Sequence, residues 1–131
     1  NNNGFINPPI QRGSTVIYGN MKEMEDSAKD PLKQSGPVYG RFGTPAAKNF
    51  EASMSTLECG YASVCTCSGL SAITTAIMAF VQTGDHILIT DSTYLPTRNF
   101  CQFLTKMGIE VEYYEPGIGS GISSLFRKQT R

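Results

Sequence analysis

The stretch from Gly84 to Tyr114, GDHILITDSTYLPTRNFCQFLTKMGIEVEYY, decides the fold class. It opens with a short apolar run, His86 to Thr90, that is typical of a buried strand. A helical repeat of apolar residues begins near Pro96, carries Phe100, Phe103, Leu104 and Met107, and ends at Gly108. A second strand, with apolar side chains at alternate positions, is expected over 109–114. Strand, helix and strand at this spacing predict a mainly parallel sheet in an α/β domain.

Two helices are expected upstream of this unit. Thr44 can cap the first helix, Pro45 can be its first residue, and Gly60 can end it. Its apolar stripe, which we expect to be buried, is Ala47, Phe50, Met54 and Leu57. After a short strand predicted over 61–66, Ser68-Gly69 turns into the second helix, with an apolar face of Ile73, Ile77, Phe80 and Val81. At the other end of the chain, glycines around Pro116 predict a turn, and a further helix is expected over 122–126.

Residues 1–44 are predicted to be an arm, and residues 45–131 the first part of the α/β domain. Glycine and proline interrupt every possible long element in the first 45 residues, and one short, charged, solvated helix fits Met21 to Lys29. An ordered arm of that length cannot bury itself, so we expect it to lie across another surface. The alternation predicts a further strand after Arg131, so we expect an incomplete domain, the N-terminal part of a longer protein, with poor solubility by itself.

Composition narrows the class of protein. The chain has 131 residues, 40% of them hydrophobic, with 11 Lys plus Arg against 11 Asp plus Glu. These values argue against disorder, and the balanced charge argues against binding nucleic acid or an anionic membrane surface. No apolar run approaches a membrane span, and the polar N-terminus does not resemble a secretory signal. The expected location is the cytoplasm.

The four cysteines, Cys59, Cys65, Cys67 and Cys101, do not have the spacing of a zinc site, and His86 is the single histidine. We therefore expect no metal. A disulfide framework is not expected either, and the thiols are predicted to be free and buried on helix and strand faces. His86 is predicted to be a turn or strand-edge residue.

Three local features could carry chemistry. Gly69 opens a helix after a predicted strand, where unpaired amides and the helix dipole suit a phosphate, although Ser68 could be a plain helix cap. Tyr39 and Arg41 could donate hydrogen bonds to a phosphate, although each could equally be an ordinary surface residue. Tyr94 follows a strand, where ligand-facing residues are found, although loop tyrosines also cap cores.

In this order, the three features resemble the Cys/Met-metabolism enzymes that depend on pyridoxal 5′-phosphate (PLP), a family that includes cystathionine lyases and synthases. The resemblance runs from about Phe5 to the last residue. It is strongest in Tyr39-Gly40-Arg41-Phe42-Gly43-Thr44-Pro45, Ser68-Gly69-Leu70-Ser71-Ala72-Ile73 and Gly84-Asp85-His86-Ile87-Leu88. Within the family, three segments are most similar to bacterial cystathionine β-lyases: Asp91-Ser92-Thr93-Tyr94-Leu95-Pro96, Asn99-Phe100-Cys101 and Pro116-Gly117-Ile118-Gly119.

The resemblance implies a fold and roles for particular residues. The expected fold is an N-terminal arm plus the first part of the three-layer α/β/α large domain of the aspartate aminotransferase-like transferases (fold type I). Main-chain amides at Gly69 and Leu70 would hold the cofactor phosphate, which Tyr39 and Arg41 of an adjacent subunit would also contact. Tyr94 would stack on the cofactor ring and help to deprotonate the substrate amine. Many family members have Met in place of Leu70, and Asn-Pro-Thr in place of residues 44–46.

The resemblance also implies an activity and an assembly. The complete enzyme would cleave L-cystathionine to homocysteine, pyruvate and ammonia in methionine biosynthesis, as a homo-oligomer, with a dimer of dimers expected. Cystathionine γ-synthase, cystathionine γ-lyase, methionine γ-lyase and a non-catalytic truncated module are the alternatives. In the family, the cofactor-binding lysine lies beyond the part that this stretch resembles. Lys48, Lys106 and Lys128 are predicted on helices, outside the expected position, so none of them is assigned this role. We therefore expect the 131-residue chain alone to be inactive.

Overall fold

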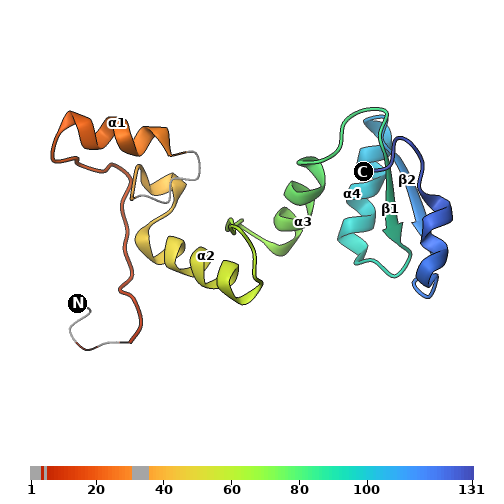
Figure 1. Ribbon diagram of the computed structural model, residues 1–131, viewed down its shortest axis with the longest axis horizontal. Coiled ribbons are helices and arrows are strands. Elements are labelled where there is room, and N and C mark those ends of the chain that lie inside the picture. Colours follow the sequence, from red (N-terminus) through yellow and green to blue (C-terminus); the bar gives the residue numbers. More distant parts are fainter. Residues whose placement is uncertain (1–3, 5, 31–35) are drawn as a thin grey trace. The chain divides into compact units, whose positions relative to one another are not determined.

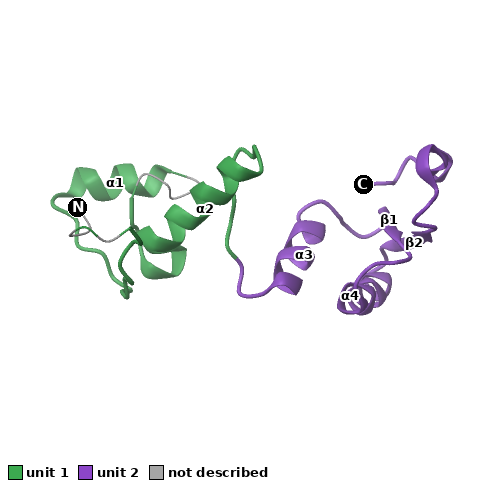
Figure 2. Cartoon of the chain, turned by 90° about the horizontal axis from the view of Figure 1, so that it is seen from below, with its two compact units in different colours: residues 1–65 green, residues 66–131 purple. Residues whose placement is uncertain are grey.

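A computed structural model describes residues 4, 6–30 and 36–131, which form two compact units, residues 1–65 and 66–131 (Figure 2). The elements (Figure 1) are helices α1 (Met21–Lys29), α2 (Pro45–Leu57), α3 (Gly69–Met78) and α4 (Leu95–Lys106), strands β1 (His86–Thr90) and β2 (Glu110–Tyr114), and 3₁₀ turns η1 (Gly40–Phe42) and η2 (Gly119–Leu125). Phe5, where the resemblance begins, lies outside the described residues. The proposed boundary between residues 44 and 45 remains a prediction.

The second unit contains the predicted parallel pair. Strands β1 and β2 run parallel, with His86 opposite Glu110 and Thr90 opposite Tyr114, and α4 connects them. Leu104 of α4 is fully buried against Ile87 and Ile109. Ile77, Val81, Ile89, Phe100 and Val111 pack around this core. The strand–helix–strand prediction is confirmed, with α4 beginning one residue before the predicted Pro96 and β2 one residue after Ile109.

Helix α4 ends where the glycine signal predicted. Gly108 has φ +80°, a left-handed conformation that glycine adopts without the cost of a Cβ clash. A Cβ on Gly108 would lie 2.9 Å from Cγ2 of Thr83, so the position is also too crowded for a side chain. The Thr83 hydroxyl donates to the Met107 carbonyl at 2.9 Å, and the Gly84 amide donates to the Gly108 carbonyl at 2.8 Å. These contacts tie the end of α4 to the loop before β1.

Three predictions for the second unit are wrong in detail. Phe80 lies beyond the end of α3 and is 76% exposed, so it does not belong to a buried face. The segment predicted as a helix over 122–126 is the 3₁₀ turn η2, in which the Ser123 and Ser124 hydroxyls donate to carbonyls three residues back. Such local bonds compete with regular helix hydrogen bonding. Lys128 lies outside any helix, unlike Lys48 and Lys106.

In the first unit, α1 forms as predicted and has no buried residue. Asn20 caps it, since its side chain accepts from the Glu23 amide at 2.9 Å while the Glu23 carboxylate accepts from the Gly19 amide at 2.9 Å. This reciprocal arrangement satisfies amides at the start of a charged, solvated helix without any tertiary contact. None of the helices in the described ranges has the length and apolar character that crossing a bilayer demands.

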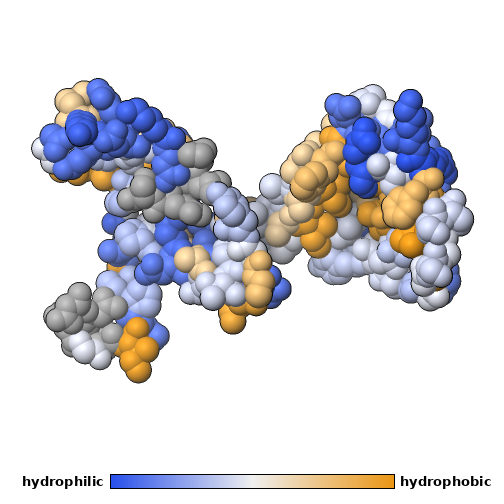
Figure 3. Space-filling view, viewed as in Figure 1, coloured by the Kyte–Doolittle hydropathy of each residue, from blue (hydrophilic) through white to orange (hydrophobic). Residues whose placement is uncertain are grey.

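Helix α2 starts as predicted, with Thr44 at the cap position and Pro45 first, although the Thr44 side chain makes no cap bond. Its apolar stripe is not buried as expected: Phe50 is 57% and Leu57 74% exposed. The buried residue of α2 is Glu51. Ala47 and Met54 are half-buried, so no residue of the stripe is fully covered by the described part of the first unit, and hydrophobic residues lie at the surface of that unit (Figure 3).

The end of α2 also differs from the prediction. Cys59, at φ +52°, takes the left-handed position assigned to Gly60, whose amide donates to the Ser55 carbonyl at 2.8 Å. Residues 61–66 form no strand. All four thiols are free as expected, yet only Cys101 is buried. The other three lie at the end of α2 or in the segment that follows it, not on a packed face.

Candidate functional site

Helix α3 begins with unpaired amides. Ser68 has an extended backbone and caps the helix, because its hydroxyl oxygen accepts from the Ser71 amide at 3.1 Å. Its carbonyl accepts from the Ala72 amide at 3.0 Å. The amides of Gly69 and Leu70 precede these bonds and have no partner among the residues the structure describes. Helix-starting amides of this kind, with the helix dipole behind them, attract anions.

The approach to these amides is open. Gly69 is exposed, and a Cβ built on it would meet no other atom within 4 Å. Leu70 is 36% exposed. The sequence also allowed Ser68 to be a plain helix cap, and Ser68 does cap the helix. Its hydroxyl oxygen accepts from the Ser71 amide, however, so the amides of Gly69 and Leu70 are left without a partner among the described residues. The site has room for a ligand oxygen to reach the main chain.

Tyr94 lies in the second unit with α3. It belongs to the loop between β1 and α4, and Figure 1 shows this loop at the same end of the unit as the start of α3. Its carbonyl accepts from the Thr97 amide at 2.9 Å and the Arg98 amide at 3.2 Å, so its backbone is held by the first turn of α4. The Tyr94 residue is 63% exposed, and its side chain makes no cap bond. It does not cap the core, and its phenol is free to meet a ligand.

Tyr39 and Arg41 flank Gly40 in the first unit. The Gly40 amide donates to the Ser14 carbonyl at 2.7 Å, and a Cβ there would lie 1.9 Å from the Gly13 carbonyl oxygen. Only glycine fits so close to another backbone. The Arg41 guanidinium lies 5.1 Å from the centre of the Tyr39 ring. The two predicted phosphate donors therefore lie side by side, on either side of a glycine that is fixed against Gly13 and Ser14. Gly69, Leu70 and Tyr94 belong to the other unit.

A polar cluster that sequence reasoning missed surrounds the loop that carries Tyr94. Arg98 of α4 donates from one guanidinium nitrogen to the Asp91 carbonyl at 2.6 Å and to its carboxylate at 2.8 Å. The Asp91 hydrogen bond raises the pKa of Arg98. Arg98 also lies over the Tyr113 ring at 4.3 Å. Burial raises the pKa of Cys101 and of Tyr113, which keeps both groups protonated.

Glu51 is the second group that sequence reasoning missed. Its carboxylate accepts from the Cys65 amide at 2.8 Å and from Lys48 Nζ at 2.9 Å. Burial of the carboxylate raises the pKa of Glu51, but the Cys65 amide and Lys48 lower it by more, so the net pKa is below its ordinary value of 4.5. In the sequence, a glutamate three residues after Lys48 indicates only an ion pair on the exposed face of a helix. Its contact with Cys65, fourteen positions away, has no local signature.

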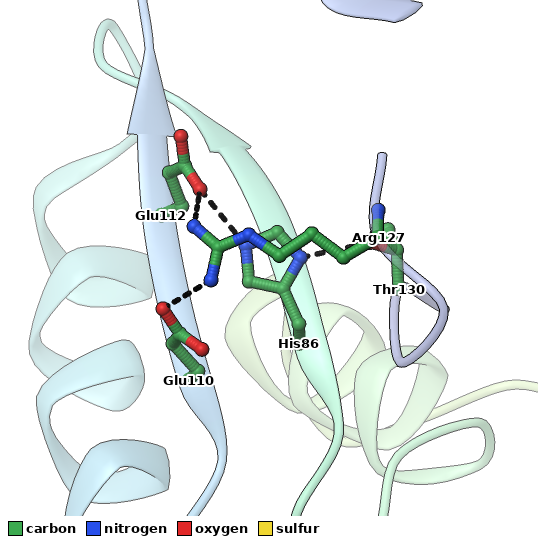
Figure 4. Close-up of polar contacts among 5 residues, drawn as sticks. All are labelled: His86, Glu110, Glu112, Arg127 and Thr130. Atoms are coloured by element: carbon green, nitrogen blue, oxygen red, sulfur yellow. Dashed lines mark hydrogen bonds and ion pairs between the residues drawn. The ribbon is translucent and has the colours of Figure 1, made fainter. Parts of the chain in front are cut away.

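His86 is the first residue of β1, at the edge of the strand as predicted, and it is buried, at 1% exposure, among the polar side chains drawn in Figure 4. Its ring nitrogens contact the Thr130 hydroxyl at 2.8 Å and the Glu112 carboxylate at 3.2 Å. Arg127 pairs with Glu110 and Glu112 beside it. His86 and Glu110 are the first residues of their strands, so this network lies at the opposite end of β1 from Tyr94. No group of possible metal ligands occurs within the described ranges.

Free helix-starting amides and an exposed tyrosine after the carboxyl end of a strand are features found where α/β domains bind phosphate-containing ligands. The family pattern described as "Cys/Met metabolism PLP-dependent enzyme" matches residues 1–131. The chain belongs to this family, whose cofactor is pyridoxal 5′-phosphate.

Individual relatives carry related names. The chain is 42% identical over 129 residues to a Rhizobium johnstonii protein named "Putative cystathionine beta-lyase", covering 98% of this chain and 31% of that protein. It is 30% identical over 129 residues to an L-methionine gamma-lyase of Fusobacterium nucleatum, covering 98% and 32%. A structure of cystathionine gamma-lyase from Lactobacillus plantarum with L-serine matches with a TM-score of 0.75 at 24% identity, covering 94% and 29%. The chain thus spans about a third of these relatives.

Proposed function

We propose that this chain is the N-terminal part of a PLP-dependent carbon–sulfur lyase that cleaves L-cystathionine to homocysteine, pyruvate and ammonia. Two observations favour β-elimination: the segment Asp91 to Pro96 is similar to cystathionine β-lyases, and identity to the Rhizobium relative with that name exceeds identity to the methionine γ-lyase. The cytoplasm is the proposed location, and a dimer of dimers the proposed assembly.

The observation that carries the proposal is the pair of free amides at Gly69 and Leu70. A phosphate needs hydrogen-bond donors and room to approach them, and the open start of α3 fits that requirement. These two amides would hold the cofactor phosphate. Tyr39 and Arg41 of a second copy of the chain would donate to the same phosphate. The predicted arm, residues 1–44, would then lie across the surface of that neighbouring copy.

Tyr94 is the proposed catalytic residue in this part of the protein. When bound, the cofactor withdraws electrons from the substrate Cα, which makes loss of the Cα proton and of the sulfur group at Cβ feasible. The Tyr94 ring would cover the cofactor ring. Its oxygen makes no hydrogen bond to other described residues, and as a phenolate, after release of the phenol proton to solvent, it would take a proton from the incoming ammonium group and return to the neutral phenol. The lysine that binds the cofactor would lie outside these 131 residues.

Removing one amide tests the phosphate site in the protein that contains this chain. Gly69→Pro deletes a single N–H at the first helical position, where proline is tolerated, and the extended Ser68 suits a following proline. Gly69→Ala is the matched control, because it keeps the N–H and fills open space. PLP affinity should fall at least tenfold in Gly69→Pro, the effect of one charge-assisted hydrogen bond, and stay near wild type in Gly69→Ala. Equal affinities in both variants would refute this site.

The products distinguish the proposed reaction from its alternative. Pyruvate from L-cystathionine indicates β-elimination, whereas 2-oxobutyrate indicates γ-elimination. The γ-lyase alternative has its own support in the Fusobacterium relative. Measuring both oxo acids from one incubation of the protein with PLP and L-cystathionine decides between the two reactions.

A further inference from the structure

Four residues, Asp91 to Tyr94, connect β1 to α4 and are held mainly through their backbone. The Asp91 amide donates to the Tyr114 carbonyl at 2.8 Å, which fixes the start of the loop to β2. The Thr93 amide donates to the Thr90 carbonyl at 3.0 Å. At the far end, the Tyr94 carbonyl accepts the first amides of α4. The loop therefore needs a link between its two ends to have one conformation.

Arg98 supplies that link. Its amide donates to the Tyr94 carbonyl at 3.2 Å, and its guanidinium returns to the carbonyl and carboxylate of Asp91 at 2.6 and 2.8 Å. A single residue therefore contacts both ends of the loop. The guanidinium plane also lies 4.3 Å from the Tyr113 ring centre, and Tyr113 is paired with Ile89 of β1. This stacking restricts the arginine in a way that a lysine could not reproduce.

The same contacts argue against Arg98 as a binding residue for a substrate carboxylate. Its charge is already paired with Asp91, and one guanidinium nitrogen donates twice to that residue. A substrate carboxylate would have to displace Asp91 and release the loop. The Arg98 side chain is 35% exposed, so solvent reaches it beside its contacts with Asp91 and Tyr113. Its contacts indicate that Arg98 holds the loop between β1 and α4 in position.

We propose that Arg98 is a positioning residue for Tyr94: by clamping Asp91 against the first turn of α4, it fixes where the Tyr94 phenol meets the cofactor. The inference rests on the proposed function, because it requires Tyr94 to act on the cofactor and the substrate amine. Misplacing a reacting group by about 1 Å can cost up to about a hundredfold in rate. The loop between β1 and α4 contains no other side chain that joins both its ends among the described residues.

The test compares Arg98→Met with Arg127→Met in the PLP-loaded protein. Both variants remove a surface arginine paired with carboxylates, but Arg127 pairs with Glu110 and Glu112 at the opposite end of the strands. We expect Arg98→Met to lower kcat roughly tenfold, to shift the absorbance band of the bound cofactor and to weaken PLP affinity. Arg127→Met should leave the spectrum and kcat unchanged. Arg98→Lys should recover part of the loss, and Asp91→Asn should reproduce part of it.

A double-mutant cycle with Tyr94→Phe separates the outcomes. If Arg98 acts through Tyr94, Arg98→Met changes kcat less than about twofold once the phenol is absent. The inference is wrong if Arg98→Met lowers kcat by the same factor in the wild type and in Tyr94→Phe, or if Arg98→Met has the kcat and cofactor spectrum of the wild type. The proposed function stands in either case. If Tyr94→Phe itself has wild-type kcat and cofactor spectrum, the proposed role of Tyr94 fails and the inference fails with it. Should Arg98→Met not fold, Arg98→Lys and Asp91→Asn in the same cycle give the answer.

Discussion

Replacing Glu51 with alanine is expected to release the segment that follows helix α2. The buried Glu51 carboxylate accepts from the Cys65 amide at 2.8 Å and pairs with Lys48 at 2.9 Å. The Ser55 and Ser63 hydroxyls, 2.9 Å apart, make the other side-chain link between α2 and this segment. Glu51 is therefore the charged group that holds the segment on α2. Without its carboxylate, the Cys65 amide would have to hydrogen-bond to water instead.

The expected magnitude follows from these contacts. A hydrogen bond to a charged group is worth about 1.5–3 kcal/mol, and a partly exposed ion pair such as that with Lys48 less than about 1 kcal/mol. Glu51→Ala should thus lower the free energy of opening this segment by about 2–3 kcal/mol. That change corresponds to a roughly 30- to 150-fold loss of protection of the Cys65 amide. Lys48→Met keeps the carboxylate and should lose less than about fivefold.

Acid should reproduce the effect of the alanine variant. The pKa of Glu51 is lowered in the folded protein, so its contribution to stability is complete above the ordinary value of 4.5 and is lost as the pH falls below 4.5 through the folded pKa. Glu51→Gln keeps an acceptor for the Cys65 amide but cannot titrate. Its protection at Cys65 should be weaker than wild type at neutral pH and independent of pH across the acid range.

Amide hydrogen exchange, corrected for the intrinsic rate at each pH, measures this prediction at a single residue. Exchange at amides in α4, in the other unit, is the internal control for global unfolding. Unchanged protection of the Cys65 amide in Glu51→Ala, with α4 also unchanged, would refute the reasoning. An equal loss in Lys48→Met would assign the effect to the ion pair instead of the carboxylate–amide bond.

Three further changes test the packing of the chain. Leu104→Ala should destabilise the second unit by about 2–5 kcal/mol in denaturant titration, because Leu104 is fully buried, whereas Phe103→Ala on the same helix, 53% exposed, should cost much less. Thr97 is 4% exposed and its hydroxyl has no partner in the structure, so Thr97→Val should be neutral or raise stability by up to about 1–3 kcal/mol; a clear loss in the same titration would show a missed hydrogen bond. Gly40→Ala should separate the Tyr39–Arg41 segment from Ser14, since its Cβ would lie 1.9 Å from the Gly13 carbonyl oxygen, and faster exchange of the residue-40 amide would report it, with Gly36→Ala, in open space, as the control.

Local signals in the sequence were sufficient for the order and type of most elements. Met21–Lys29, the start of α2 at Pro45, His86–Thr90 and the end of α4 at Gly108 were all predicted from caps, periodicity or glycine. These features depend on residues three or four positions apart. The features at Tyr39-Arg41, Gly69 and Tyr94, taken together, resemble the family that the comparison over residues 1–131 confirmed.

Burial and polar contacts at a distance were decided only by the tertiary structure. The periodicity of α2 could not say how far Phe50 and Leu57 are covered, and in the structure both are more than half exposed. His86 begins its strand as predicted, but its contacts with Glu112 and Thr130, 26 and 44 positions away, have no local signal in the sequence. The physical reason is that a sequence pattern fixes which face of an element is apolar or charged, whereas the partner of that face depends on how distant segments pack. Arg98 over Tyr113, and Glu51 on the Cys65 amide, follow from packing of that kind.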